Sequence, residues 1–315
     1  MRIFDNPNFD FIRWRWPATA LSILIILAGL VTVIVRGGLP LGVDFTGGTV
    51  VIVQFAQAVS EDDIRGALGD QAADAVVQRF GAVETNQMMI RLPLEDTGNE
   101  SIDAVSADVQ NRLRGGNLGE FTVINRELVS PTIGGDLRSK AIWATITALG
   151  GILAYIAFRF RFSFAVGAVV ATFHDILVTL AFLTWFGYDL SLNVVAAILT
   201  IAGYSVNDTV VVFDRVRETQ RLAKRDGLAT VVNRAVNQTL SRTVITAGTT
   251  VIAVIALYLF GGDVLSGFAF TMIVGVVAGT YSTVFIASSV AIVLSSRTRT
   301  KAPAAQPDGR KRARA

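Results

Sequence analysis

The 315-residue sequence contains no cysteine and only one histidine, His174. The missing cysteines exclude a disulfide framework, a thiolate metal site and a cysteine nucleophile, and a single histidine excludes a multi-histidine metal centre. Charged residues make up 17% of the chain, against roughly 25% in an average soluble domain. Apolar residues make up 52%, and the mean hydropathy is +0.52. An integral membrane protein without metal or cofactor is therefore the main class that remains.

Proline is also scarce, and all seven prolines lie outside residues 132–302, where unbroken helices are therefore allowed. A bilayer-spanning helix needs about 20 mostly apolar residues. Six stretches meet this condition: 18–35, 140–158, 163–186, 190–213, 236–260 and 264–294. The first also fits a signal peptide after Arg13 and Arg15, but no clear cleavage site follows, so we expect an uncleaved helix. In the sixth, Gly275 and Gly279 form a GxxxG pattern that suggests close helix packing.

The distribution of lysine and arginine predicts the orientation of these spans. Basic residues precede the first span, join the second to the third and the fourth to the fifth, and follow the sixth, whereas the connections at Gly187–Asp189 and Gly261–Asp263 contain none. We therefore expect residues 1–17 and a basic, disordered tail over 295–315 to be cytoplasmic, with segment 36–139 on the opposite side. The tail fits attraction to anionic lipid better than nucleic-acid binding, so no nucleic-acid partner is expected.

Segment 36–139 has the pattern of a small independent domain. The sequence predicts strands over 43–55, 76–80, 88–92 and 121–129, and helices over 60–68 and 101–113. A capping box of Ser60 and Asp63 opens the first helix. This βαββαβ order is the ferredoxin-like pattern. Because the segment has no histidine, no cysteine and no Ser-His-Asp set, we interpret it as a binding or mechanical domain.

Two glycine pairs flank this domain. Gly47 and Gly48 end the glycine-rich stretch 42–48, and Gly134 and Gly135 lie where the chain returns to the membrane. Glycine permits tight turns, and no lysine follows the first pair as a phosphate-binding loop requires. We therefore interpret both pairs as turns or hinges on which the domain pivots, although simple loop glycines would have the same sequence.

Ionisable and amide side chains concentrate in the third, fourth and fifth spans. They are His174 and Asp175 in the third, Asn207, Asp208 and the terminal Asp214 in the fourth, and Arg242 in the fifth. A charge inside a span costs a few kcal/mol, so each of these residues needs a reason to be there. At 1.5 Å per residue, Asp208 lies about 8 Å and Arg242 about 10 Å from the cytoplasmic helix ends. We therefore predict that Asp208 pairs with Arg242.

This predicted pair has two interpretations, a static structural ion pair and a proton-coupling site in which Arg242 controls the protonation of Asp208. In the second, His174, Asp175 and Asn207 are secondary members, and Asp214 is a solvated boundary residue. We assign no role to Asp189 and Asp263, which we expect to face water.

Two aspartates on neighbouring spans also fit an intramembrane aspartyl protease. That chemistry requires two carboxylates that share a proton. The expected pairing of Asp208 with Arg242 and the greater depth of Asp175 argue against it.

Several motifs, in order along the chain, resemble the SecF family of the RND superfamily. They are Phe9–Phe11, Gly42–Gly48, Val129–Gly134, His174-Asp175, Asn207–Thr209, Phe213–Glu218 and Asn237–Thr243. The resemblance covers roughly residues 5–295. It implies a polytopic α-helical membrane protein with six transmembrane helices of RND type and a ferredoxin-like α+β exoplasmic domain between helices 1 and 2. The implied units are 1–17, helix 1 at 18–35, the domain at 36–139, helices 2–6 at 140–294, and the tail at 295–315.

The resemblance further implies a non-enzymatic accessory subunit of the Sec protein-export machinery in the bacterial inner membrane. Such a subunit works with SecD, uses the proton gradient to promote preprotein translocation, and keeps residues 36–139 in the periplasm. The implied partners are SecD, the SecYEG translocon and preproteins, with YajC and YidC as further candidates. The family's proton-linked aspartate and arginine correspond to Asp208 and Arg242. The alternative is an RND-type proton-driven exporter of small molecules or lipids, although most such exporters carry two halves and two outside domains in one chain.

Overall fold

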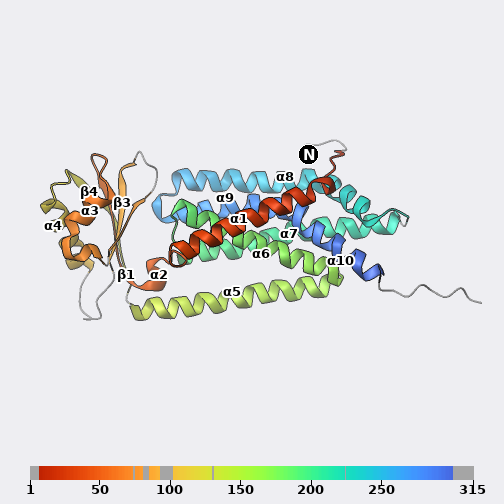
Figure 1. Ribbon diagram of the computed structural model, residues 1–315, viewed down its shortest axis with the longest axis horizontal. Helices are drawn as coiled ribbons and strands as arrows, with labels where there is room; N and C mark the ends of the chain where they lie inside the picture. The colour runs from red at the N-terminus through yellow and green to blue at the C-terminus, as the bar shows by residue number, and fades with distance from the viewer. Residues whose placement is uncertain are drawn as a thin grey trace, which may run out of the picture.

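The computed structural model describes residues 7–73, 75–80, 85–92, 102–129, 131–223 and 225–300. These residues form a small sheet domain at one end of a long helical bundle (Figure 1). Six helical stretches in this part of the chain are long and apolar enough to cross a membrane, as the sequence predicts. The protein is therefore a multi-pass membrane protein with a sheet-containing domain early in the chain.

The sheet domain has the predicted ferredoxin-like order. Its strands are β1 (Gly48–Phe55), β2 (Val76–Phe80), β3 (Gln87–Leu92) and β4 (Phe121–Val129). They lie in the order β2-β3-β1-β4, and all neighbours are antiparallel. Helices α3 (Glu61–Leu68) and α4 (Ile102–Gly115) pack on one face, with a short 3-10 turn η2 (Gly69–Ala73) after α3. The capping box of Ser60 and Asp63 is confirmed.

Strand β1 is apolar on both faces because it is covered on both. Val51 and Val53 are buried beneath α3 and α4. Val50 and Ile52 point to the other face of the sheet, where they pack against the segment that precedes the strand.

That preceding segment corrects one prediction. Residues expected to begin the strand instead form a one-turn helix, α2 (Val43–Thr46). Gly47 and Gly48 separate it from β1 with φ angles of 69° and 125°, which glycine adopts without the strain imposed by a Cβ atom. The predicted turn at this glycine pair is therefore present.

The bundle begins with a 3-10 turn, η1 (Ile12–Trp14), and α1 (Arg15–Val35). After the sheet domain come α5 (Pro131–Arg159), α6 (Phe162–Phe186), α7 (Leu192–Leu222), α8 (Leu228–Phe260), α9 (Asp263–Ser282), the π-helical segment η4 (Thr283–Ala287) and α10 (Ser288–Thr300). Helices α6, α7 and α9 form the centre, whereas α1, α5 and α8 leave most of their surface uncovered. The start of α1 and the end of α10 lie at the bundle end opposite the sheet domain (Figure 1).

Several helices extend beyond their predicted limits. Helix α5 starts at Pro131 and not at 140, so Gly134 and Gly135 lie within a helix, and the expected turn there is wrong. A Cβ atom on Gly134 would lie 2.9 Å from the backbone nitrogen of Gly47. The two glycine pairs therefore meet through close packing of α5 against the end of α2.

The connection between α7 and α8 is much shorter than expected. The predicted fourth span ends at 213 and the fifth begins at 236. In the structure, α7 runs on to Leu222 and α8 begins at Leu228. The added turns are stable because they bury Val216, Val231 and Val232. The first residues of the predicted disordered tail are likewise part of α10, which reaches Thr300, and the rest of that tail lies outside the described residues.

Candidate functional site: a buried polar centre and its link to the sheet domain

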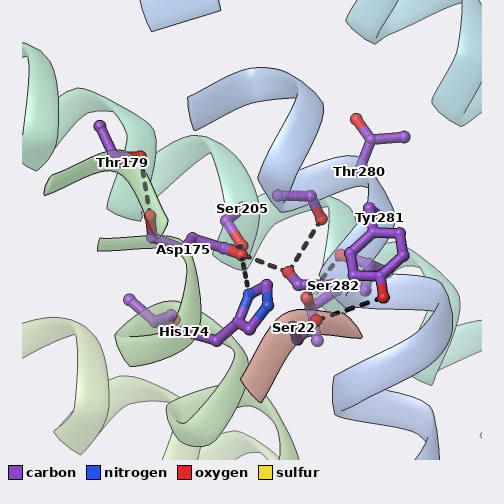
Figure 2. A network of polar contacts seen from close by, with 12 residues as sticks. Ser22, His174, Asp175, Thr179, Ser205, Thr280, Tyr281 and Ser282 are labelled. Atoms are coloured by element: carbon purple, nitrogen blue, oxygen red, sulfur yellow. Dashed lines mark hydrogen bonds and ion pairs between the residues drawn. The ribbon is translucent and has the colours of Figure 1, made fainter. Parts of the chain in front are cut away.

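The polar centre of the bundle is built around Asp175 on α6. Its carboxylate is fully buried, with 0% of the side chain exposed. His174 Nδ1 lies 2.9 Å from Asp175 Oδ1, and the hydroxyls of Ser205 and Ser282 donate to Oδ2 at 2.5 and 2.8 Å (Figure 2). Three partners from α6, α7 and α9 therefore surround the carboxylate and satisfy the hydrogen-bonding requirement of a buried charged group.

His174 connects this carboxylate to the first helix. Its ring stacks on Tyr281, with 6.1 Å between ring centroids. The Tyr281 hydroxyl donates to the carbonyl oxygen of Ala18 at 2.5 Å and accepts from Ser22 at 3.2 Å. Figure 2 shows the imidazole with Asp175 on one side and Ser22 and Tyr281 on the other. Its Nε2 atom is buried and has no hydrogen-bond partner among the described residues.

Asp208 lies one helical turn after Ser205 on α7 and is half-buried. Its Oδ1 atom accepts from the Thr243 hydroxyl on α8 at 2.7 Å. The Oδ2 atom is buried and has no hydrogen-bond partner within the described chain.

The predicted direct pairing of Asp208 with Arg242 is not present. Arg242 is close enough to act on Asp208 electrostatically, but no ion pair joins them among the residues that the structure describes, and the Arg242 side chain is exposed. Consecutive helical residues point about 100° apart, so with Thr243 facing α7, Arg242 points away. Asn207 is exposed for the same reason, being next to Asp208.

Three further polar residues have structural partners that the sequence did not reveal. Asp214 is partly exposed, as expected, but it also forms an ion pair with Arg159 of α5 at 2.9 Å. Asn237 and Asn233 on α8 hold the backbone of the segment before α1, because both bond to Phe9 and Asn233 also accepts from the Phe11 N–H at 3.0 Å.

The loop between α6 and α7 fastens the sheet domain to the bundle, which corrects the expectation that Asp189 has no role. Asp189 forms an ion pair with Arg91 of β3, and only 15% of each side chain is exposed. Arg91 also donates to the Leu41 carbonyl at 3.1 Å, and the Gly42 N–H donates to the Leu190 carbonyl at 2.9 Å. Burial raises the pKa of Asp189, and the Arg91 guanidinium opposes this shift.

Asp44, in the glycine-rich stretch, completes this attachment. Its Oδ2 atom accepts from the Leu192 N–H at 2.8 Å, at the first turn of α7. A carboxylate at a helix N-terminus satisfies a free N–H group and the helix dipole together. The sheet domain is thus joined directly to α7, the helix that carries Asp208.

Two family descriptions match this chain. Residues 109–297 match the family described as protein export membrane protein SecD/SecF, C-terminal, and residues 33–59 match the SecD/SecF GG motif. The second match contains α2 and Gly47-Gly48.

Curated relatives match over nearly the whole length. Protein translocase subunit SecF of Rhodothermus marinus is 41% identical over 304 residues, which cover 94% of this chain and 96% of the relative. SecF of Escherichia coli O157:H7 is 37% identical over 292 residues, which cover 92% of this chain and 88% of the relative.

Solved structures of SecDF also match. The crystal structure of SecDF, a translocon-associated membrane protein from Thermus thermophilus, has a TM-score of 0.80 and 35% identity, covering 93% of this chain and 39% of that chain. SecDF in a super-membrane-facing form has a TM-score of 0.65 and 34% identity, covering 95% and 40%. The present chain thus spans about two fifths of the SecDF chains.

Proposed function

Because this chain belongs to the SecF family of protein translocase subunits, we propose that it acts with SecD to promote preprotein translocation across the bacterial inner membrane at the expense of the proton gradient. The observation that carries this proposal is the match of more than nine tenths of the chain to SecF of Rhodothermus marinus at 41% identity. The SecDF chains are more than twice as long, which leaves room for a SecD half beside the matched part. The relatives described above are translocase subunits, so nothing favours an exporter of small molecules or lipids.

The exposed polar residues of α7 and α8 support a membrane partner. Asn207 and Arg242 point out of this chain from within spans. Polar and charged groups inside a bilayer face protein or a water-filled cavity, because exposure to lipid is costly. We infer that SecD covers this α7–α8 face and that Arg242 lies at the contact between the two subunits. SecYEG is the proposed further partner, with YajC and YidC as additional candidates.

The proposed topology places both termini in the cytoplasm and residues 36–139 in the periplasm. It is supported by the position of the sheet domain at the bundle end opposite the start of α1 and the end of α10 (Figure 1). In this arrangement the sheet domain contacts preprotein on the far side of the membrane. Its role is mechanical and not enzymatic.

Asp208 is the proposed proton-coupling residue. A carboxylate with one unpartnered buried oxygen has room for a proton, and the absence of a direct ion pair with Arg242 weakens the static interpretation. A proton that crosses 100 mV supplies about 2.3 kcal/mol. This energy is enough to shift a balanced conformational equilibrium by more than a factor of ten, since about 1.4 kcal/mol corresponds to a tenfold change.

The test measures preprotein release into inverted membrane vesicles with and without an uncoupler. We expect Asp208→Asn and Arg242→Met to abolish the gradient-dependent part of release, because one removes the titrating group and the other its nearby charge. Asp208→Glu keeps a titratable carboxylate and should retain part of the gradient-dependent release. Asp214→Asn, at the boundary, should have a milder effect.

Recovery of each variant in complex with SecD is the control for folding and assembly. Full gradient dependence in correctly assembled Asp208→Asn protein would contradict the proposed coupling role.

A further inference from the structure

Two consecutive hydroxyl residues lie between the buried carboxylate of Asp175 and the half-buried carboxylate of Asp208. Ser282, the last residue of α9, donates to Asp175 at 2.8 Å. Thr283, the first residue of the π-helical segment η4, lies 2.9 Å from the Thr209 hydroxyl and beside the carboxylate of Asp208. The α9–η4 junction therefore contacts both acidic sites through adjacent side chains.

Helix α7 provides the opposite side of this contact. Ser205 and Thr209 are four residues apart and share one face of the helix. Ser205 binds Asp175 together with Ser282, and Thr209 binds Thr283. Hydroxyl groups of α7 and the α9–η4 junction therefore meet at two positions about one helical turn apart. Asp208 lies next to the second position, where Thr209 meets Thr283.

The junction has π-helical geometry and packs closely against α6. The Ser288 hydroxyl donates to the carbonyl of Thr283 at 3.0 Å, across five residues. The segment lies against α6, where a Cβ atom on Gly167 would come within 2.6 Å of the Ala287 carbonyl oxygen. Single π-helical turns inside α-helices occur frequently at functional sites.

We propose that Ser282 and Thr283 form a hydroxyl bridge through which the protonation of Asp208 is coupled to the Asp175–His174 pair. This proposal rests on the proposed function and assigns its site two positioning residues. A threonine hydroxyl has one proton to donate. When Asp208 is ionised, Thr283 donates to it and accepts from Thr209; when Asp208 is protonated, Thr283 accepts from Asp208 and donates to Thr209. This reversal of donor and acceptor at Thr283 changes the hydrogen bonding of the residue next to Ser282, which donates to Asp175.

The titratable groups around the bridge are few in the described part of the chain. Asp175 and His174 face it from α6, and Tyr281 lies beside His174 from α9. Arg242 of α8 and Tyr204 of α7 both act electrostatically on Asp208. Asp208 is therefore the group whose titration the bridge would make sensitive to the Asp175–His174 pair. Two sites that interact by more than about one pK unit titrate as a pair and not as independent residues.

The experiment follows the carboxyl vibrations of the purified complex with SecD by infrared difference spectroscopy across a pH titration. Asp208→Asn and Asp175→Asn assign the two signals. In otherwise unchanged protein, we expect Asp175→Asn to move the titration midpoint of Asp208 by about one pH unit. In a Thr283→Val background, which removes the hydroxyl and keeps the side-chain shape, the same substitution should leave the midpoint where it is.

Two variants control for a purely structural role. Thr283→Ser keeps the hydroxyl and should restore the coupling. Thr271→Val removes another buried hydroxyl of α9, which bonds only to its own helix at Gly267, and should leave the coupling intact. An Asp208 midpoint that does not respond to Asp175→Asn in the unaltered background would overturn the proposal, as would coupling that persists in Thr283→Val.

The spectroscopic result is independent of export and so separates the two proposals. If the carboxylates are coupled but Asp208→Asn still exports with full gradient dependence, the proposed coupling role of Asp208 in export fails and the bridge stands. If Asp208 is essential for gradient-dependent export but the pH profile of export is the same in Thr283→Val and unaltered protein, the bridge fails and the proposed function stands.

Discussion

At the scale of single residues, neighbours in the sequence have opposite environments. Thr243 and Asp208 face each other between α7 and α8, whereas the adjacent Arg242 and Asn207 point out of the chain. The inward pair holds the carboxylate that we propose as the proton-coupling group. The outward pair provides polar groups that, inside a bilayer, face protein or a water-filled cavity.

The ion pair of Asp189 and Arg91 leads to a prediction about pH. Burial raises the pKa of Asp189 above its ordinary value of 3.8, despite the opposing effect of Arg91. The folded state thus holds this proton more tightly than the unfolded state does. Its contribution to stability is full below the ordinary pKa and falls as pH rises through the raised pKa. We expect Asp189→Asn to reduce the loss of thermal stability that accompanies a rise in pH above the ordinary pKa of 3.8.

Asp70 provides a control of opposite sign. Its exposed carboxylate has a pKa lowered by its hydrogen bond with Arg112, so its contribution is present above the ordinary pKa and is lost as pH falls. Asp70→Asn should therefore not reduce the loss of thermal stability that accompanies rising pH. Identical melting profiles for Asp189→Asn and unaltered protein would contradict the interpretation of Asp189.

Arg91→Ala is expected to be more damaging than Asp189→Asn. It leaves a largely buried carboxylate without its counter-charge, at a cost of about 1–3 kcal/mol. Asp189→Asn also leaves the Arg91 guanidinium without its counter-charge, but Asn keeps the shape of Asp and an amide oxygen that accepts from Arg91. Chemical or thermal unfolding of the two variants near neutral pH measures this difference, and an equal or smaller loss in Arg91→Ala would show that Arg91 does not support Asp189.

At the scale of helices, the predicted close packing at the GxxxG pattern of α9 is confirmed. A Cβ atom on Gly275 would lie 2.1 Å from Cδ1 of Ile201 on α7. One on Gly279 would lie 3.1 Å from Cβ of Ser205 and 3.5 Å from Oδ2 of Asp175. The small residues of α9 therefore let α7 approach closely enough for both serines to reach Asp175.

Gly275→Ala should destabilise the bundle by about 1–3 kcal/mol, the usual cost of overpacking a buried contact. Gly248→Ala on α8 is the matched control, because within the described chain no side chain or other element beyond its immediate neighbours lies within 4 Å of the added Cβ. It should be neutral or gain up to about 1 kcal/mol from helix propensity. Thermal unfolding in detergent compares the two. Equal stability of the two variants would mean that α7 and α9 do not pack as described.

At the scale of the whole molecule, the sheet domain and bundle are mechanically joined through the α6–α7 loop. Asp44 binds the first turn of α7, and Arg91 binds Asp189 before it. Movement of α7 at Asp208 therefore has a direct structural route to the periplasmic domain in the proposed topology.

The absence of cysteine makes that topology testable by single introduced cysteines. Arg114→Cys, exposed at the end of α4, should react with a membrane-impermeant maleimide added to the outside of spheroplasts. Arg225→Cys, exposed between α7 and α8, should react only in inverted vesicles. The reverse pattern would show that the proposed orientation is wrong.

Much of the architecture was determined by the sequence itself. The number of spans and the βαββαβ order follow from hydropathy and periodicity, which neighbouring residues carry, and the Ser60 capping box is formed within one turn of chain. The polar residues of the third, fourth and fifth spans were also recognisable as unusual, because charge inside an apolar run is conspicuous whatever its partners are.

Only the tertiary structure decided how those polar residues are paired. Depth along a helix follows from counting residues, but rotation about the helix axis depends on packing, so Thr243 and not Arg242 meets Asp208. Asp175 binds Ser282 across 107 positions, and Asp189 binds Arg91 across 98. Helix ends likewise depend on burial against other elements, as in the added turns of α7 and α8. Contacts between distant segments leave no local pattern in the sequence, because they arise when folding brings separate elements together.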